Sequence, residues 1–291
     1  MEFRTIVDIE RPAWLVEPAE RVLCVGSCFA DHIGRMFADE HFPATINPYG
    51  VMYNPASILH TLQRLENEQR NANFQLAILT LGTNHVYIEK ETGQIVDNCQ
   101  KRPQALFTEN KLTVEECAGY LRQSVALLHR WNPSMKVMLT VSPIRYRKYG
   151  YHGSQLSKST LLLAIEELLN DSSLFTFHSS LYYFPAYEIV NDELRDYRFY
   201  APDMLHPTAQ TVEYIWQRLV ETCFSDAAKQ YLEEWQPLKR ALAHRPFNPE
   251  SEEYQQFMEV TRNQLKAFET KWKVPSEHTF LSYITIIDHA T

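Results

Sequence analysis

The chain has 291 residues, a length that fits two average domains or one α/β domain with an appendage. Hydrophobic residues make up 45% and charged residues 22%, which excludes a disordered chain, a fibrous repeat and a small disulfide-stapled scaffold. The net charge of −8 argues against a surface that tracks phosphates, so we expect no nucleic-acid partner.

The cysteines and the N-terminal residues indicate in which cellular compartment the protein works. The five cysteines are an odd number without a C-x-x-C pair, which favours free thiols in a reducing environment. Residues 1–15 contain acids and lack the apolar core of a signal peptide, and no stretch approaches the roughly 18 apolar residues of a membrane span. We therefore expect a soluble, cytoplasmic protein with no membrane partner.

Short apolar runs predict buried strands, and amphipathic stretches predict helices between them. In chain order we expect a strand at 21–26, a helix from about 29, a helix opened by Asn54 and Pro55, a strand at 75–81, a hairpin at 85–98 turning at Thr92 and Gly93, a helix at 113–131, a strand at 135–143, a helix at 157–171, a strand at 174–180 and a helix at 211–224. Strands that alternate with helices predict a three-layer α/β/α fold with a mostly parallel sheet.

The pattern changes after Leu242. A polar, proline-rich stretch at 243–251 precedes one long helix at 251–272, and a short segment at 278–288 ends the chain. We expect an α/β domain at 1–240 and a C-terminal helical extension at 241–291 packed on it, with an oligomer contact as the alternative.

Ser27 follows the first predicted strand, where a helix begins, and Gly26 before it permits a tight turn. Free N–H groups and the positive end of a helix dipole favour developing negative charge at such a point. A serine there is a candidate nucleophile if a base reaches it. The alternative is that Ser27 only caps the helix.

Asp203 and His206 lie three residues apart on a loop that enters the last helix of the α/β region. A carboxylate at this spacing can fix the tautomer of the imidazole and stabilise the imidazolium. The alternative is an Asp-capped turn with an exposed histidine.

Two further residues are candidate donors to an oxyanion. Asn84 follows the strand at 75–81, at the sheet edge where open α/β folds keep their sites. Gly50 closes a turn from which its N–H could face a ligand. Both residue types are also typical of ordinary turns.

The candidates occur in the order serine, glycine, asparagine and Asp-x-x-His along the chain. With this order, the sequence resembles the GSCFA family, named for the string at 26–30, and more broadly the SGNH (GDSL-like) hydrolases. The match extends over most of the chain, including the strings at 47–55, 80–87 and 183–207. The resemblance implies an SGNH-hydrolase-like, flavodoxin-like fold and a serine esterase or acylhydrolase, with O-acetylated carbohydrate as one candidate substrate. An acyltransferase with the same triad and a non-catalytic binding protein on the same scaffold are the alternatives.

The resemblance also implies residue roles. Ser27 corresponds to the nucleophile, His206 to the general base and Asp203 to its orienting partner, while the Ser27 N–H, Gly50 and Asn84 correspond to oxyanion-hole donors. The sequence departs from the superfamily pattern at Gly26, where an Asp is usual, and at His85, where an Asp usually follows the Asn. Gly50 is assigned by order alone.

Cys28 also lies near a helix N-terminus, where a thiol pKa can fall, so a Cys–His enzyme is an alternative. Side chains 27 and 28 diverge by about 100° on a helix, so only one of them can face the base. The motif order assigns Ser27 to that position, and we expect Cys28 to be a packed thiol.

Other polar residues near the predicted strand ends are candidates for substrate binding, with surface ion pairs as the alternative. These candidates are Cys28, His85, Arg145, Tyr187 and Glu188. The hairpin at 85–98 lies beside Asn84 and could act as a lid. The histidines are scattered, and neither H-E-x-x-H, a P-loop nor G-x-G-x-x-G occurs, so we expect no metal, no nucleotide and no cofactor. The expected partner is a small-molecule or carbohydrate ester.

Overall fold

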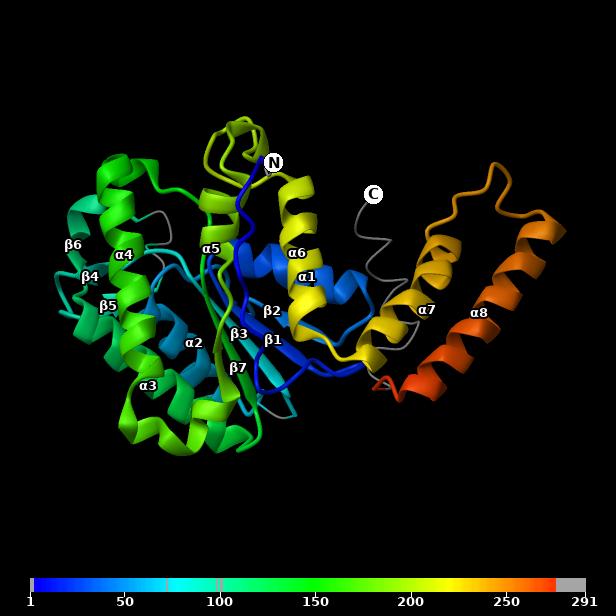
Figure 1. Ribbon diagram of the computed structural model, residues 1–291, viewed down its shortest axis with the longest axis horizontal. Helices are drawn as coiled ribbons and strands as arrows, with labels where there is room; N and C mark the ends of the chain where they lie inside the picture. The colour runs from blue at the N-terminus through cyan, green and yellow to red at the C-terminus, as the bar shows by residue number, and fades with distance from the viewer. Residues whose placement is uncertain (1–2, 72, 98, 100–101, 276–291) are drawn as a thin grey trace.

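Five parallel strands form the central sheet of the computed structural model, which describes residues 3–71, 73–97, 99 and 102–275 (Figure 1). Their order in the sheet is β2 (Ala44–Ile46), β1 (Val22–Gly26), β3 (Leu76–Leu81), β7 (Lys136–Val141) and β8 (Leu181–Tyr183). Numbered within this sheet by chain order, the strands run 2-1-3-4-5, which is the flavodoxin-like doubly wound order. The predicted three-layer α/β/α fold with a mostly parallel sheet is confirmed.

Helices cover both faces of this sheet (Figure 1). One face carries α1 (Cys28–Asp39) and α6 (Ala209–Cys223), and the other carries α2 (Pro55–Asn67), α3 (Val114–Trp131) and α4 (Gly150–Leu169). The residues of β1 alternate between the two cores: Cys24 packs with the α1 side, whereas Leu23 and Val25 pack with the α2 side. A strand buried on both faces needs apolar residues at every position, which explains its continuous apolar run.

Local signals place the starts of α2 and α3 correctly, whereas α4 begins at Gly150, seven residues before the start predicted at 157. Asn54 accepts a hydrogen bond from the Ser57 N–H at 2.9 Å and Pro55 takes the first helical position, as predicted for α2. Thr113 and Glu116 form the predicted capping box at the start of α3.

A second, antiparallel sheet follows β3 directly. The predicted hairpin is confirmed as β4 (His85–Glu89) paired with β5 (Ile95–Val96). A third strand, β6 (Phe107–Lys111), pairs with the other edge of β4 and was not expected. The hairpin is therefore one part of a small sheet that stands over the carboxyl end of β3.

The strand predicted at 174–180 is wrong. Residues Ser172–Ser180 form a 3₁₀ helix, and the strand β8 follows it. Asp171 caps this turn by accepting a hydrogen bond from the Ser173 N–H at 2.8 Å. The other short turns are Gln104–Leu106, Arg147–Tyr149, α5 (Ala186–Glu188), a π-helical turn at Ile189–Leu194, and Tyr197–Phe199.

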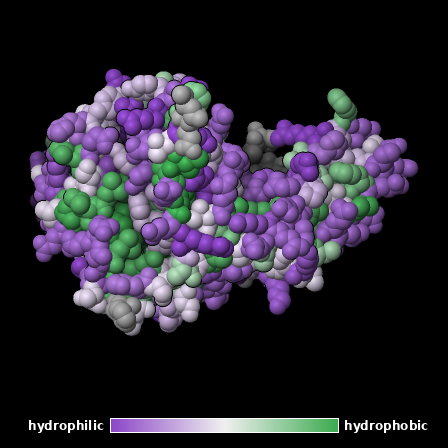
Figure 2. Space-filling view, viewed as in Figure 1, coloured by the Kyte–Doolittle hydropathy of each residue, from purple (hydrophilic) through white to green (hydrophobic). Residues whose placement is uncertain are grey.

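The helices α7 (Asp226–Leu242) and α8 (Glu252–Trp272) project from one side of the sheet domain (Figure 1). Tyr231 and Trp235 of α7 tie the pair to the end of α1, donating to the His41 carbonyl at 2.6 Å and the Asp39 carbonyl at 2.8 Å. Figure 2 shows mostly hydrophilic side chains over this projection.

The helix at 251–272 is confirmed as α8, and the segment predicted at 278–288 lies outside the described residues. The division into 1–240 and 241–291 stays a prediction, and its boundary falls within α7. Over the ranges that the structure describes, no helix combines the length and apolarity required to cross a membrane.

Candidate active site

The candidate site lies at the carboxyl ends of β1 and β3, where the strand order of the sheet reverses. Open α/β sheets bind ligands in the crevice at such a switch point. Gly26 ends β1 with a φ of +144°, and the Ser27 N–H then donates to the Thr80 carbonyl of β3 at 3.0 Å. This turn fixes Ser27 at the edge of the sheet and starts α1.

Ser27 is the N-cap of α1. Its Oγ accepts a hydrogen bond from the Phe29 N–H at 3.2 Å and lies 3.0 Å from the Thr80 Oγ1. The residue is fully buried. The capping interpretation of Ser27 is therefore observed, and its role as a nucleophile stays a prediction.

Asp203 and His206 form a tight pair on their loop. The His206 Nδ1 lies 2.6 Å from the Asp203 Oδ2, and the Asp203 Oδ1 accepts the N–H groups of Leu205 and His206 at 2.8 and 3.0 Å. Hydrogen bonds from the His206 backbone and ring, and from the Leu205 N–H, lower the Asp203 pKa to about 2. The carboxylate is thus ionised at neutral pH, and the Nε2 of His206 is left for another partner.

The loop that carries this pair is tied to the segment after β7. The Arg145 N–H donates to the Leu205 carbonyl at 3.1 Å, and the Arg145 Nη1 donates to the Met204 carbonyl at 3.1 Å. Arg145 thus holds the loop that carries Asp203 and His206. It also lines a separate cavity of about 250 Å³ beside Tyr197 and Tyr200.

His206 makes no hydrogen bond to Ser27 within the described residues. His206 lies instead near His32 of α1, whose pKa is lowered by burial and also by the charge of His206. His206 therefore lies near the helix that Ser27 caps.

The three predicted oxyanion donors all have protein acceptors. The Ser27 N–H is bonded to Thr80, the Gly50 N–H donates to the Asn47 carbonyl at 2.8 Å, and the Asn84 Nδ2 donates to the Leu112 carbonyl at 2.7 Å. Each donor thus serves a turn or an adjacent strand in this structure. Their assignment to an oxyanion hole stays a prediction.

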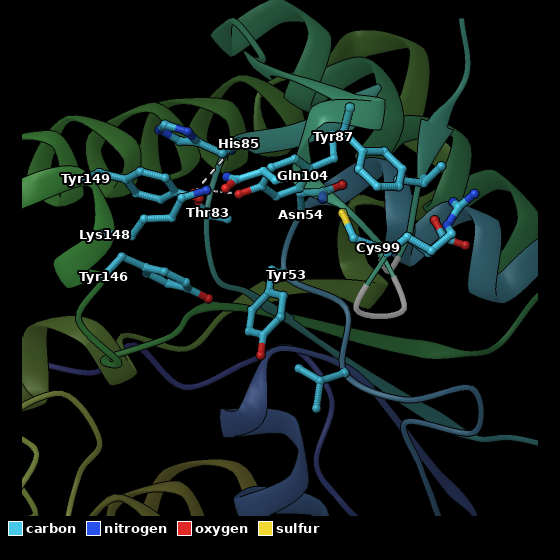
Figure 3. A pocket seen from close by; sticks show the side chains of 15 residues that line it. Tyr53, Asn54, Thr83, His85, Tyr87, Cys99, Gln104, Tyr146, Lys148 and Tyr149 are labelled. Atoms are coloured by element: carbon cyan, nitrogen blue, oxygen red, sulfur yellow. Dashed lines mark hydrogen bonds between the residues drawn. The ribbon is translucent and has the colours of Figure 1, made fainter. Parts of the chain in front are cut away.

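A cavity of about 510 Å³ lies between the β4–β6 sheet and the turn after β7. Its lining combines aromatic rings with polar groups: Tyr53, Asn54, Thr83, His85, Tyr87, Gln104, Phe107, Tyr146, Lys148 and Tyr149 are among its residues (Figure 3). Rings with polar edges are the usual lining of a small-molecule site.

Two tyrosines stand between this cavity and Ser27. The rings of Tyr53 and Tyr146 meet edge to face with centroids 5.9 Å apart, at the side of the cavity nearest α1 (Figure 3). The Tyr53 hydroxyl lies 3.6 Å from the Cys28 Sγ. A ligand in the cavity would reach Ser27 only after one of these rings moves.

The predicted substrate-binding residues divide into two groups. His85 lines the cavity, where its ring stacks on Tyr149 at 3.6 Å, and Cys28 lies half-buried behind Tyr53. Burial lowers the His85 pKa, despite the opposing effect of Glu109 at 2.9 Å.

Arg145, Tyr187 and Glu188 are absent from the cavity lining. The Arg145 guanidinium packs over the Tyr151 ring, the Tyr187 hydroxyl donates to Gln155, and Glu188 accepts from the Tyr183 hydroxyl. For these three residues the structure shows interactions within the protein.

The sequence interpretation assigned no role to Tyr53, Thr83 or Tyr149. Tyr53 directly precedes the cap of α2, and that proximity is the one signal that could have placed it near the sheet edge. Across the described ranges, no group of three or more His, Cys, Asp and Glu side chains is positioned to hold a metal ion.

Lys158 lies fully buried beneath the site. Its Nζ donates to the Gly82 carbonyl and to the Ser142 carbonyl, both at 2.7 Å, at the ends of β3 and β7. Burial lowers its pKa to about 7, because none of its hydrogen-bond partners carries a negative charge. This lysine holds the two strand ends together.

Lys158 gives the stability of the protein a specific pH dependence. Between pH 7 and the ordinary lysine value of 10.5, the unfolded chain binds a proton that the folded protein does not. The free energy of unfolding should therefore rise with pH in this window, by up to about 1 kcal/mol per pH unit. Urea unfolding of the wild type and Lys158→Met from pH 7 to 10 should show this extra slope in the wild type alone. Parallel curves would contradict the account.

The fold and the site together define a flavodoxin-like α/β protein with a serine and a His–Asp pair at the edge of its sheet. A family model described as "GSCFA family" matches residues 21–77 and 68–219, and one described as "GSCFA domain protein, C-terminal domain" matches residues 235–280. The chain belongs to the GSCFA family. A comparison with curated proteins finds no match.

Solved structures offer distant likenesses. One is a carbohydrate esterase family 3 protein from Talaromyces cellulolyticus, with 11% identity over 74% of this chain and 99% of that chain and a TM-score of 0.40. Another is an active-site mutant of a family two carbohydrate esterase from Clostridium thermocellum, with 10% identity over 71% of this chain and 63% of that chain and a TM-score of 0.39. Likeness at this level says nothing about the activity of this chain.

Proposed function

We propose that this protein is a serine acylhydrolase in which Ser27 is the nucleophile, His206 the general base and Asp203 its partner. The observation that carries the proposal is the 2.6 Å contact between the His206 Nδ1 and the Asp203 Oδ2, on a loop that lies near α1. This contact fixes the tautomer that leaves Nε2 unprotonated and able to accept a proton.

In the proposed reaction, Nε2 of His206 takes the Ser27 proton as Oγ attacks the acyl carbon. The proton then passes to the leaving alcohol as the bond between the acyl carbon and that alcohol breaks. Water then hydrolyses the ester on Ser27. His206 takes a proton from the water as it attacks the acyl carbon, and gives it to the Ser27 Oγ as the ester bond breaks. The N-terminus of α1 favours the negative charge that develops next to Ser27.

The cavity supports an O-acylated carbohydrate as the substrate class. Tyrosine rings can pack against the apolar face of a sugar, while groups such as Asn54, Gln104 and His85 offer hydrogen bonds to hydroxyls. An acyltransferase is the second candidate, and the burial of Ser27 favours it, because exclusion of water protects an acyl-enzyme from hydrolysis.

The test is hydrolysis of p-nitrophenyl acetate and longer esters by the wild type, Ser27→Ala and Cys28→Ala. We expect Ser27→Ala to lose at least about 10³-fold in kcat/KM, since no acyl-enzyme can form. Cys28→Ala should stay within about tenfold of the wild type, because the thiol lies against the Tyr53 hydroxyl and the core, and no hydrogen bond joins it to Ser27 or His206 among the described residues.

Each other outcome assigns a different function. Loss in Cys28→Ala alone would move the nucleophile by one residue. Acylation of Ser27 that turns over only when an alcohol acceptor is added would identify an acyltransferase. Equal background rates in all three proteins would favour a binding protein.

A further inference from the structure

The hydroxyl of Tyr146 is buried and has no hydrogen-bond partner among the residues that the structure describes. A buried hydroxyl without a partner costs free energy, and native proteins rarely keep one without a purpose. The ring itself is well placed, with Tyr53 at its edge and the Lys158 Nζ 5.2 Å from its centroid. The Tyr146 N–H donates to the Ser154 Oγ at 3.2 Å, which fixes the backbone of the residue.

The unpartnered oxygen faces the site. A Cβ added to Gly82 would lie 2.5 Å from the Tyr146 Oη and 3.3 Å from the Ser27 Cβ. The tyrosine hydroxyl and the serine therefore border the same small space above Gly82. Gly82 keeps that space open, because any side chain at this position would fill it.

Each of the other expected donors already has a protein acceptor, and the Asn84 amide uses one of its two N–H groups in this way. The N–H groups of Ser27 and Gly50 and the amide of Asn84 each donate to a protein carbonyl. A substrate carbonyl at Ser27 would still need a donor for the charge that develops on its oxygen. The Tyr146 hydroxyl is the buried donor beside Ser27 that has no other acceptor.

We infer that Tyr146 is a further catalytic residue, whose hydroxyl donates a hydrogen bond to the acyl oxygen during attack by Ser27. The inference rests on the proposed function of Ser27. As the Ser27 Oγ bonds to the acyl carbon, the carbonyl π pair moves to oxygen and the Tyr146 O–H stabilises it without giving up its proton. When the carbonyl re-forms, the bond to the leaving alcohol breaks and His206 supplies the proton. Tyr53, which is 39% exposed, is the ring that moves to admit the ester.

The protonation state agrees with this role. Burial, together with the nearby Tyr53 and Cys28, raises the Tyr146 pKa well above its usual range. The hydroxyl is thus protonated, and able to donate, at neutral pH.

The experiment is the rate at which a fluorophosphonate probe labels Ser27 in the wild type, Tyr146→Phe and Tyr120→Phe. Phosphonylation passes through an oxyanion in the same place, so it reports on the donor without knowledge of the natural substrate. Tyr146→Phe should label about 10²-fold more slowly, the usual cost of one oxyanion donor. Tyr120→Phe is the control, because Tyr120 is a half-buried tyrosine on α3, and this variant should be labelled at the rate of the wild type.

Stability separates a catalytic role from a structural one. Tyr146→Phe keeps the ring and removes an unpartnered oxygen, so its Tm should equal or exceed that of the wild type. Unchanged labelling in Tyr146→Phe would overturn the inference and leave Ser27 as the nucleophile. Slower labelling together with a lower Tm would also overturn it, since the hydroxyl would then support the fold. No labelling of Ser27 in the wild type would overturn the proposed function, and the role of Tyr146 with it.

Discussion

His206→Ala is expected to lower kcat/KM for ester hydrolysis by about 10⁴-fold, and Asp203→Asn by a similar factor. His206 is the base in the proposed reaction, and Asp203 holds the ring by its Oδ2 and the loop by its Oδ1. An amide at position 203 would donate to the ring from its nitrogen and so favour the wrong tautomer. Steady-state kinetics with p-nitrophenyl acetate would measure both effects.

The matched control for these variants is His244→Ala, which removes an exposed histidine at the end of α7. Its kcat/KM should equal that of the wild type. Retention of full activity in His206→Ala would show that the Asp203–His206 contact only shapes the loop, which was the simpler interpretation of the Asp-x-x-His spacing.

Gly26→Ala is expected to destabilise the protein by at least about 3 kcal/mol. A Cβ at this position would lie 2.1 Å from the Thr80 carbonyl oxygen, and the φ of +144° is one that residues with a side chain rarely adopt. Relief of the clash would separate β1 from β3, the two strands that position Ser27. Urea unfolding would measure the loss.

Gly119→Ala provides the opposite expectation on the same scaffold. This glycine lies within α3, and nothing lies within 4 Å of an added Cβ. Alanine there should stabilise the protein by up to about 1 kcal/mol through helix propensity. A Gly26→Ala protein as stable as the wild type would contradict the described geometry of the turn before Ser27.

Most of the fold was predictable because its signals are local. The apolar run of β1, the Asn54 and Pro55 start of α2, and the capping box of Thr113 each depend on a few neighbouring residues. The short strand β2 depends on pairing with β1, a contact between distant parts of the chain. A three-residue strand of this kind leaves little periodicity for a sequence to show.

The error at 174–180 has a similar cause. This stretch has the aromatic content of a strand, but its backbone is held as a 3₁₀ helix by the cap at Asp171. The strand begins only at Leu181, where pairing with Val137 of β7 becomes possible. The local cap, together with the point at which pairing with β7 begins, thus outweighed the strand propensity of the aromatic residues.

The same distinction applies to the site. Asp203 and His206 are only three residues apart in the sequence, so their spacing alone predicted the contact between them. The positions of Tyr53 and Tyr146 over Ser27 follow from the docking of three strand ends, and no short motif records that arrangement. Likewise, the acceptors that occupy Gly50 and Asn84 are visible only in the folded chain.

The account depends most on Ser27 as the nucleophile. Incubation of the wild-type protein with a fluorophosphonate, followed by mass spectrometry of its peptides, tests that claim most directly. The account predicts a single adduct on Ser27, and this adduct should form faster in the folded protein than in the unfolded protein. An adduct on another residue, or none on Ser27 in the folded protein, would contradict it.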